Sequence, residues 1–320
     1  MPYVPYSKPY KKPSDLVTDL KAKNLSFKAP IAAESLLSQI SYYHFKIYLY
    51  PLIDQSSPGK KFYRTGVHFE SGVELYRFDE ELRVLLFRII ARIEVKLRSR
   101  LDHKISELSN SPFWYLQNEW FYTPNNNTSI IDSIRSRIGS DFNRESELYA
   151  KNFRSKYYNE THDIYKNLPP FWIASELISL GQIYKIYSSL DFSYFSSLPS
   201  PSNSLLNDLS NEFGCNDFKT LVKWIRGIRD VRNRCAHHSR LWNAKLAALA
   251  GVPSLLVYAP TKLNRPYGTI VAMWQMVKAL GITGINLRGE LLTLIKNYPE
   301  ISNHLDDMGF PIKWDQDPFW

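Results

Sequence analysis

The sequence contains few cysteines and no long uninterrupted hydrophobic run. Only Cys215 and Cys235 occur among 320 residues, and their spacing matches neither a zinc motif nor a disulfide framework. We therefore expect both thiols to be small buried groups in a reducing compartment, the cytoplasm. No apolar stretch approaches the roughly 20 residues of a membrane-spanning helix, and the first residues lack the apolar part of a signal peptide. The sequence thus predicts no membrane partner.

The motifs of common metabolic enzymes are also missing. The sequence has no phosphate-binding loop, no dinucleotide fingerprint and no metal-ligand spacing, so we expect neither a cofactor nor a metal. Acidic residues are fewer than basic ones: the chain has 31 Asp and Glu against 40 Lys and Arg, which gives a formal charge of +9. This excess favours a polyanionic partner, nucleic acid before an anionic membrane, although a merely basic soluble protein is an equal alternative on charge alone.

The sequence lacks the alternation of apolar and polar residues that is typical of strands, and it lacks the turn sequences of β-hairpins. Apolar residues recur instead at helical spacing. The longest such stripe runs from about Val73 to Leu101, and the sequence predicts an all-α protein. Loops near 54–66 and at Gly251 suggest three parts: residues 1–65 as an N-terminal helical segment with a basic arm, 66–250 as a helical core, and 251–320 as a C-terminal helical segment.

The richest stretch for chemistry runs from Arg229 to Asn243, with four arginines and two adjacent histidines. Upstream apolar residues predict a helix that starts near Asp217 and buries one face, formed by Leu221, Trp224, Ile225, Ile228, Val231 and Cys235. Arg232 falls on the same arc, and a buried guanidinium needs a carboxylate or a phosphate. Glu94 and Glu176, each within another apolar helix, are the candidate supporting carboxylates.

A basic strip lies beside that arc. At about 100° per residue, it gathers Arg226, Arg229, Asn233, His237 and Arg240. Asn233 precedes His237 by four residues, so its amide could orient the imidazole, which is suited to proton transfer near neutral pH. Candidate catalytic residues are Arg232, His237 and Asn233. Candidate RNA-binding residues are Arg226, Arg229, Arg240 and His238.

Cleavage of RNA would use this set without a metal. Histidine can take the 2′-hydroxyl proton and protonate the leaving oxygen, while arginine stabilises the phosphorane charge. The wheel places Arg232 and His237 about 140° apart, so one helix is expected to supply half a site that a second copy completes. The alternative is purely structural: Arg232 would be ion-paired and His237 would only cap the helix.

The string Arg232 to His237 resembles the R-x4–6-H motif of the HEPN superfamily, with a polar Asn233 directly after the arginine. The longer string Arg232 to Asn243 resembles the abortive-infection (Abi, AbiD/AbiF-like) family. Further blocks in family order are Lys8-Pro9, Ile40–His44, Tyr76–Arg83, Arg92–Arg100, Pro170–Trp172 with Glu176 and Leu180-Gly181, and Met308–Pro311 with Trp314. His44 and Leu180 depart from the residues common at those places, and neither is a proposed active residue.

This resemblance implies an all-α HEPN-type helical bundle that forms a homodimer with one composite active site. It also implies a metal-independent endoribonuclease, a toxin in antiviral defence, whose partners are substrate RNA and in some relatives a cognate small structured RNA. A non-catalytic RNA-binding module, or a toxin controlled by such an RNA or by a protein, stays open as the alternative.

Overall fold

The computed structural model describes residues 3–7, 9–56, 61–124, 127–160 and 163–320. Within these ranges the chain forms α-helices, short 3-10 helices and isolated bridges, and no strand, so the all-α prediction is confirmed. The chain divides into two compact units: the first contains residues 1–82 and 290–305, and the second contains residues 83–289 and 306–320. The three-part division expected from the sequence stays a prediction.

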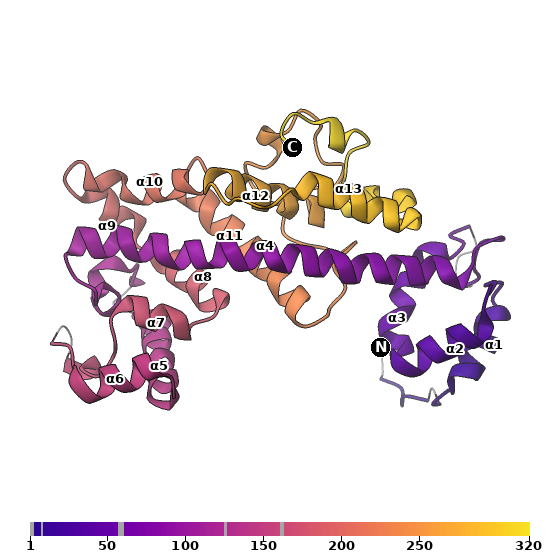
Figure 1. Ribbon diagram of the computed structural model, residues 1–320, viewed down its shortest axis with the longest axis horizontal. Coiled ribbons are helices and arrows are strands. Elements are labelled where there is room, and N and C mark those ends of the chain that lie inside the picture. The colour runs from indigo at the N-terminus through magenta and orange to yellow at the C-terminus, as the bar shows by residue number, and fades with distance from the viewer. Residues whose placement is uncertain (1–2, 8, 57–60, 125–126, 161–162) are drawn as a thin grey trace. The chain divides into compact units, whose positions relative to one another are not determined.

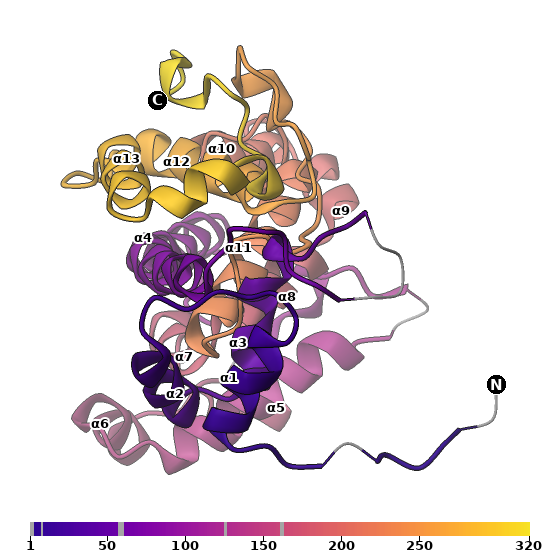
Figure 2. The ribbon, with the colours of Figure 1, turned by 90° about the vertical axis from the view of Figure 1, so that its right-hand side faces the viewer.

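The first unit opens with three short helices and the first turns of a long one. These are α1 (Pro13–Lys21), α2 (Pro30–Gln39), α3 (Tyr42–Leu49) and the start of α4 (Phe69–Ser109). Proline occupies the first position of α1 and of α2, where its missing N–H costs nothing. The three short helices lie close together (Figures 1 and 2), and α1 packs on α2.

Two polar contacts fix α4 to these helices. The buried Tyr48 hydroxyl donates to the Asp79 carboxylate at 2.7 Å, and rings from α3 and α4 surround it. The Glu70 carboxylate accepts from the backbone N–H groups of Lys28 and Ala29, at 3.0 and 3.1 Å, just before α2 begins. A residue of α4 thus satisfies donors that the start of α2 would otherwise leave unpaired.

The second unit contains the remaining helices. They are α5 (Ser129–Arg144), α6 (Leu148–Lys156), α7 (Phe171–Leu177), α8 (Leu180–Ser189), α9 (Phe192–Ser197), α10 (Leu205–Glu212), α11 (Phe218–Ala236), α12 (Pro266–Ala279) and α13 (Leu287–Asn297), which the two units share. Short 3-10 helices join them at Trp114–Leu116, Asn118–Trp120, Asp163–Tyr165, Ser202–Ser204, Pro253–Leu255, Asp306–Met308 and Trp314–Gln316, and the first unit has two more, Tyr50–Leu52 and Pro299–His304.

The long helix α4 buries one continuous apolar stripe, as its sequence spacing predicts. In the second unit the fully buried members are Leu86, Ile89, Ile90, Ile93, Leu97, Leu101 and Ile105. The buried Tyr187 hydroxyl of α8 donates to the carbonyl of Leu97 at 2.9 Å, and Arg98 donates to the carbonyl of Ser175 in α7 at 2.7 Å. Helices α7 and α8 are therefore tied to α4 by polar contacts as well as by packing.

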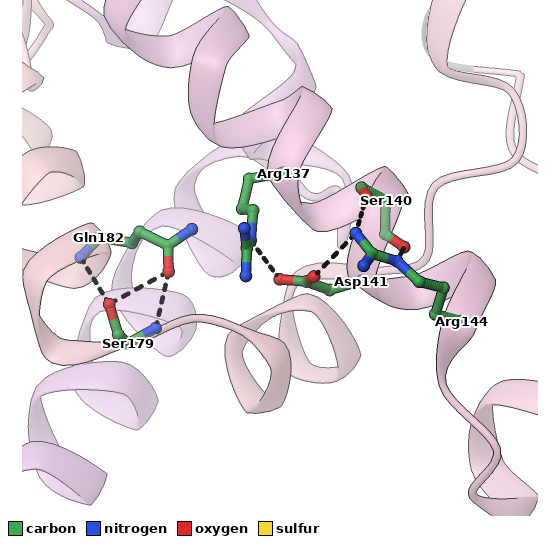
Figure 3. A network of polar contacts seen from close by, with 6 residues as sticks. All are labelled: Arg137, Ser140, Asp141, Arg144, Ser179 and Gln182. Carbon is green, nitrogen blue, oxygen red and sulfur yellow. Dashed lines mark hydrogen bonds and ion pairs between the residues drawn. The ribbon is translucent and has the colours of Figure 1, made fainter.

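Helices α5, α6 and α7 lie together at one end of α4 (Figure 1). Phe142, Ala150 and Phe153 form their shared apolar cluster. Figure 3 shows exposed ion pairs of α5, where Asp141 faces Arg137 at 2.6 Å and Arg144 at 3.8 Å. The same view shows Ser179 capping α8 through Gln182, whose N–H donates to the serine hydroxyl oxygen at 3.4 Å.

Helix α11 carries the stretch that the sequence singled out, and it packs against α8, α10 and α12. It begins at Asp217, whose carboxylate accepts from the N–H of Thr220 at 2.8 Å, so the start expected from the sequence is confirmed. Each of the six apolar residues expected on its inner face is buried. In the described part of the chain, no helix is both long and apolar enough to cross a membrane.

Candidate functional site

The C-terminal end of α11 closes in a well-formed turn. His237 is the C-cap, and His238 follows in the left-handed region with φ 52°. The N–H of His238 donates to the carbonyl of Cys235 at 3.3 Å, and the N–H of Ser239 donates to the carbonyl of Arg234 at 2.9 Å. These bonds are those of a Schellman motif, which normally favours glycine at the place that His238 occupies. The turn fixes where both histidine side chains leave the backbone.

The chain after this turn folds back along α11. The Arg234 guanidinium donates to the carbonyl of Arg240 at 3.0 Å, and the Trp224 indole donates to the carbonyl of Ala250 at 2.8 Å. Between them, Leu249 approaches Gly227 so closely that an added Cβ would lie 3.0 Å from its Cδ2 atom. Glycine at this place in α11 therefore lets the returning segment 241–250 lie against the helix.

The helix and the returning segment enclose an open hollow of about 500 Å³, called here the α11 hollow. Its lining residues are Arg226, Asp230, Asn233, Arg234, His237, Ser239, Lys245, Leu246 and Ala247. Three cationic residues and one carboxylate line it, so the hollow offers net positive charge to a ligand. An anion such as an RNA phosphate is the chemistry that such a lining accepts.

Three of the predicted residues meet in this hollow. Asn233 and His237, one helical turn apart, line it together with Arg226, two turns before Asn233. The side chains of Asn233 and His237 are exposed, and in the described part of the chain neither forms a hydrogen bond or an ion pair within the protein. Both are therefore available to a ligand.

Arg232 lies elsewhere. It does not line the α11 hollow, and it is half-exposed although its wheel position falls on the buried arc. Its expected burial is corrected by the structure: a long arginine side chain can cover apolar neighbours with its methylene groups while the guanidinium stays in water. Within the described residues it has no hydrogen-bond or ion-pair partner. A phosphate would supply one.

The two carboxylates expected to support Arg232 have other surroundings. Glu94 pairs with Arg98 at 2.5 Å, one turn along α4, in a position where both side chains are largely covered. Glu176 is exposed and lines a separate groove between α4 and α7 together with Trp172. The structure records no contact of either carboxylate with Arg232, because the neighbouring Arg98 already satisfies Glu94 and the Glu176 side chain is turned to solvent.

The other candidate RNA-binding residues are placed differently from one another. Arg229 is held between the Asp230 carboxylate at 2.7 Å and the face of the Tyr184 ring at 4.5 Å, at the contact of α11 with α8. His238 is exposed, Arg240 is half-exposed, and neither lines the α11 hollow. Of the expected basic strip, only Arg226 therefore shares the hollow with Asn233 and His237.

The structure adds three charged residues that the sequence reading did not select. Asp230 and Arg234 lie on the side of α11 that faces the hollow. A helical wheel predicts this for Asp230, because it follows Arg226 by four residues and precedes His237 by seven. Lys245 comes from the returning segment. No helical periodicity connects it with α11, so only the folded chain places it there.

Metal ligation has no support in the described residues. No group of three or more His, Cys, Asp or Glu side chains is arranged there to hold an ion. Cys215 and Cys235 are buried, and burial raises the pKa of the Cys215 thiol. Both fit the expected role of small core groups.

Comparisons with known proteins add a family. A search of the curated proteins and of the solved structures found no match. The model of one family, described as Abi-like protein, matches residues 35–243, well over half of the chain. The match starts shortly before Ile40–His44 and ends at Asn243, the last residue of the string that carries the R-x4-H motif. The resemblance that the sequence indicated is confirmed: this chain belongs to the family of Abi-like proteins.

Proposed function

We propose that this Abi-like protein is a HEPN-type, metal-independent endoribonuclease that acts in the cytoplasm as a toxin in abortive-infection defence against phage. His237 transfers protons, Asn233 orients the imidazole and Arg232 stabilises the charge that develops on the phosphate. Arg226 attracts the RNA backbone, joined by Arg234 and Lys245. Arg229, Arg240 and His238 contact the backbone farther from the reacting phosphate.

One observation carries the proposal. His237 and Asn233 are exposed together in a positively charged hollow at the end of α11, a place where no structural role occupies either side chain. A histidine that only capped the helix would direct its ring to the backbone. Here the cap is built from main-chain bonds, and the ring is left for a ligand.

The chemistry needs no group beyond these side chains. A neutral histidine removes the 2′-hydroxyl proton, the 2′ oxygen attacks the adjacent phosphorus, and the bond from phosphorus to the 5′ oxygen breaks. A protonated histidine gives its proton to that leaving oxygen. The products are a 2′,3′-cyclic phosphate and a 5′-hydroxyl end. Arginine is always cationic and stabilises the five-coordinate phosphorus throughout.

The arrangement within one chain is half of this machinery. Among the described residues, His237 is the one histidine that lines the α11 hollow. The mechanism, however, uses a neutral histidine as the base and a protonated histidine as the acid. His237 follows Arg232 by five residues of helix, so the two side chains point in directions about 140° apart around the helix axis. A homodimer related by a two-fold axis would bring the histidine of one copy to the arginine of the other.

The test uses purified protein and total RNA in EDTA. We expect wild-type protein to produce fragments that end in 2′,3′-cyclic phosphate. Arg232→Ala and His237→Ala should each lower the rate by about 100-fold or more, as expected for loss of a proton-transfer or charge-stabilising group. Matched controls are Arg137→Ala and His103→Ala, which remove exposed residues on α5 and α4. Undiminished cleavage by both active-residue variants would end the nuclease proposal.

A second candidate is an RNA-binding module without catalysis, or a toxin that a cognate small structured RNA or a protein holds inactive. The basic lining of the α11 hollow favours it, because Arg226, Arg234 and Lys245 can hold RNA without proton transfer. In the same EDTA assay this candidate predicts intact RNA that is retained at low salt and released steeply as salt rises.

A further inference from the structure

The first unit contains a second, larger hollow of about 1020 Å³, called here the N-terminal hollow. Tyr6 and residues 9–11, which precede α1, form one wall, and α1, the end of α2 and the start of α3 form the others. Its lining includes the tyrosines Tyr6, Tyr10, Tyr42 and Tyr43, and the charged residues Lys11, Asp19, Lys23 and Lys46. All of these residues belong to one unit, so the hollow is a feature of that unit alone.

Three of the tyrosine rings stand open to water. Tyr6, Tyr10 and Tyr43 are 85, 86 and 79% exposed. Exposed aromatic surface of this size is unfavourable unless something covers it. Tyr42 differs, because it is half-buried and its phenol oxygen accepts a hydrogen bond from the buried Tyr63. The N-terminal hollow therefore combines one anchored ring with three open ring faces.

Positive charge surrounds these rings. Three lysines and one carboxylate line the hollow, and Lys11 pairs with Asp19. Lys23 and Lys46 thus supply charge that no lining carboxylate balances. The Lys46 ammonium lies 4.3 Å from the centre of the Tyr43 ring. The cation therefore lies over one face of this largely exposed ring, and a base would stack on the opposite face.

From this juxtaposition we propose that the N-terminal hollow is a second RNA site, which binds single-stranded RNA. Unpaired bases stack on Tyr10 and Tyr43, while Lys23 and Lys46 contact the phosphates. Alternating aromatic and basic side chains are how proteins bind single strands with little sequence preference, since every base has a stacking face. A duplex keeps its bases stacked inside and offers the tyrosines nothing. This site goes beyond the proposed cleavage site, because it shares no residue with α11 and requires no reaction.

The first experiment measures binding with full-length His237→Ala protein, so that the RNA survives. The probe is a fluorescein-labelled 12-nucleotide oligo(A), followed by fluorescence anisotropy. We expect Tyr43→Leu and Tyr10→Leu each to weaken binding about tenfold through lost stacking, and Tyr43→Phe to bind normally. Lys23→Gln and Lys46→Gln should each reduce the slope of log affinity against log salt by about 0.7. A duplex RNA of the same length should bind more weakly.

Matched controls are Tyr50→Leu and Lys28→Gln, which change exposed residues of the same unit outside the lining. Normal affinity in a folded Tyr10→Leu/Tyr43→Leu double variant would overturn the proposal, as would equal binding of duplex RNA.

A second readout locates the RNA directly. Oligonucleotides containing 4-thiouridine are crosslinked to the same protein, and the modified peptides are identified by mass spectrometry. We expect crosslinks within residues 6–46. Crosslinks confined to residues 226–247 would overturn the N-terminal site while leaving the nuclease proposal standing. Crosslinks within 6–46, together with no cleavage by wild-type protein, would have the opposite meaning: the N-terminal site would stand and the nuclease proposal would fail.

Discussion

Asn233 and His237 are joined by the last regular turn of α11: the N–H of His237 donates to the carbonyl of Asn233 at 3.0 Å, and both side chains line the same hollow. The backbone bond fixes their spacing, so the amide and the imidazole are held as neighbours without any contact between the side chains. Arg232, one residue before Asn233, lies outside that hollow.

Mixing two inactive chains should restore activity. If the Arg232 of one copy acts with the His237 of the other, the composite site of a wild-type dimer holds two such pairs, and a heterodimer of Arg232→Ala and His237→Ala chains keeps one of them. Equal co-expression gives half heterodimers, so about a quarter of wild-type cleavage is expected from the mixture. The measurement is the rate of RNA cleavage by the copurified mixture against each variant alone. A mixture as inactive as its parts would contradict a site in which one Arg232–His237 pair across the two-fold axis is sufficient for cleavage.

Replacing His238 by glycine should stabilise the protein. His238 has φ 52°, a conformation that costs residues with a Cβ atom roughly 1 kcal/mol and costs glycine little. We expect His238→Gly to raise the free energy of unfolding by about 0.5–1 kcal/mol in urea titrations. His237→Gly is the matched control and should lower it, since His237 has an ordinary negative φ. A loss of stability in His238→Gly would mean that the imidazole makes a stabilising contact.

Arg135 should matter for stability far more than its neighbour Arg137. The Arg135 side chain is 1% exposed and donates to the carbonyl of Tyr115 at 3.0 Å and to the Asn118 side chain at 2.7 Å. Its removal leaves the carbonyl of the buried Tyr115 unpaired and a cavity in the core, so Arg135→Ala should cost about 3 kcal/mol. Arg137→Ala, which removes a 61% exposed side chain, should change the free energy of unfolding by less than about 0.5 kcal/mol. Similar losses in the two variants would contradict the assignment of Arg135 to the core.

The cap at the start of α11 should make stability depend on pH. The hydrogen bond from the Thr220 side chain, with the backbone N–H groups behind it, lowers the pKa of Asp217 below its usual value of 3.8. A carboxyl group with a lowered folded-state pKa stabilises the protein above its unfolded pKa, and this contribution is lost as pH falls through the folded one.

Asp217→Ala should therefore lower the free energy of unfolding by about 1 kcal/mol at neutral pH. The difference from wild type should shrink as the pH falls below 3.8. Urea titrations of both proteins between neutral and acid pH measure it. A difference that stays constant down to low pH would show that the charge of Asp217 contributes nothing.

Much of this protein follows from its sequence because helical periodicity is a local property. The apolar stripe of α4, the start of α11 at Asp217 and its six buried residues can each be read from the spacing of residues in one segment. The string from Arg232 to Asn243 and the other blocks in family order likewise carry the family resemblance, and the family match ends at the last residue of that string.

Tertiary structure alone decided which charges from distant segments meet. Lys245 reaches the α11 hollow because the chain folds back over Gly227, and the N-terminal hollow exists because Tyr10 and Tyr43 come from segments that meet only in the folded unit. The partial exposure of Arg232 also depends on how its side chain packs, whereas the Glu94–Arg98 pair joins residues four apart on one helix and follows from their spacing. A helical wheel gives the direction of a side chain but not its reach or its neighbours on other segments, and these depend on packing between elements distant in the sequence.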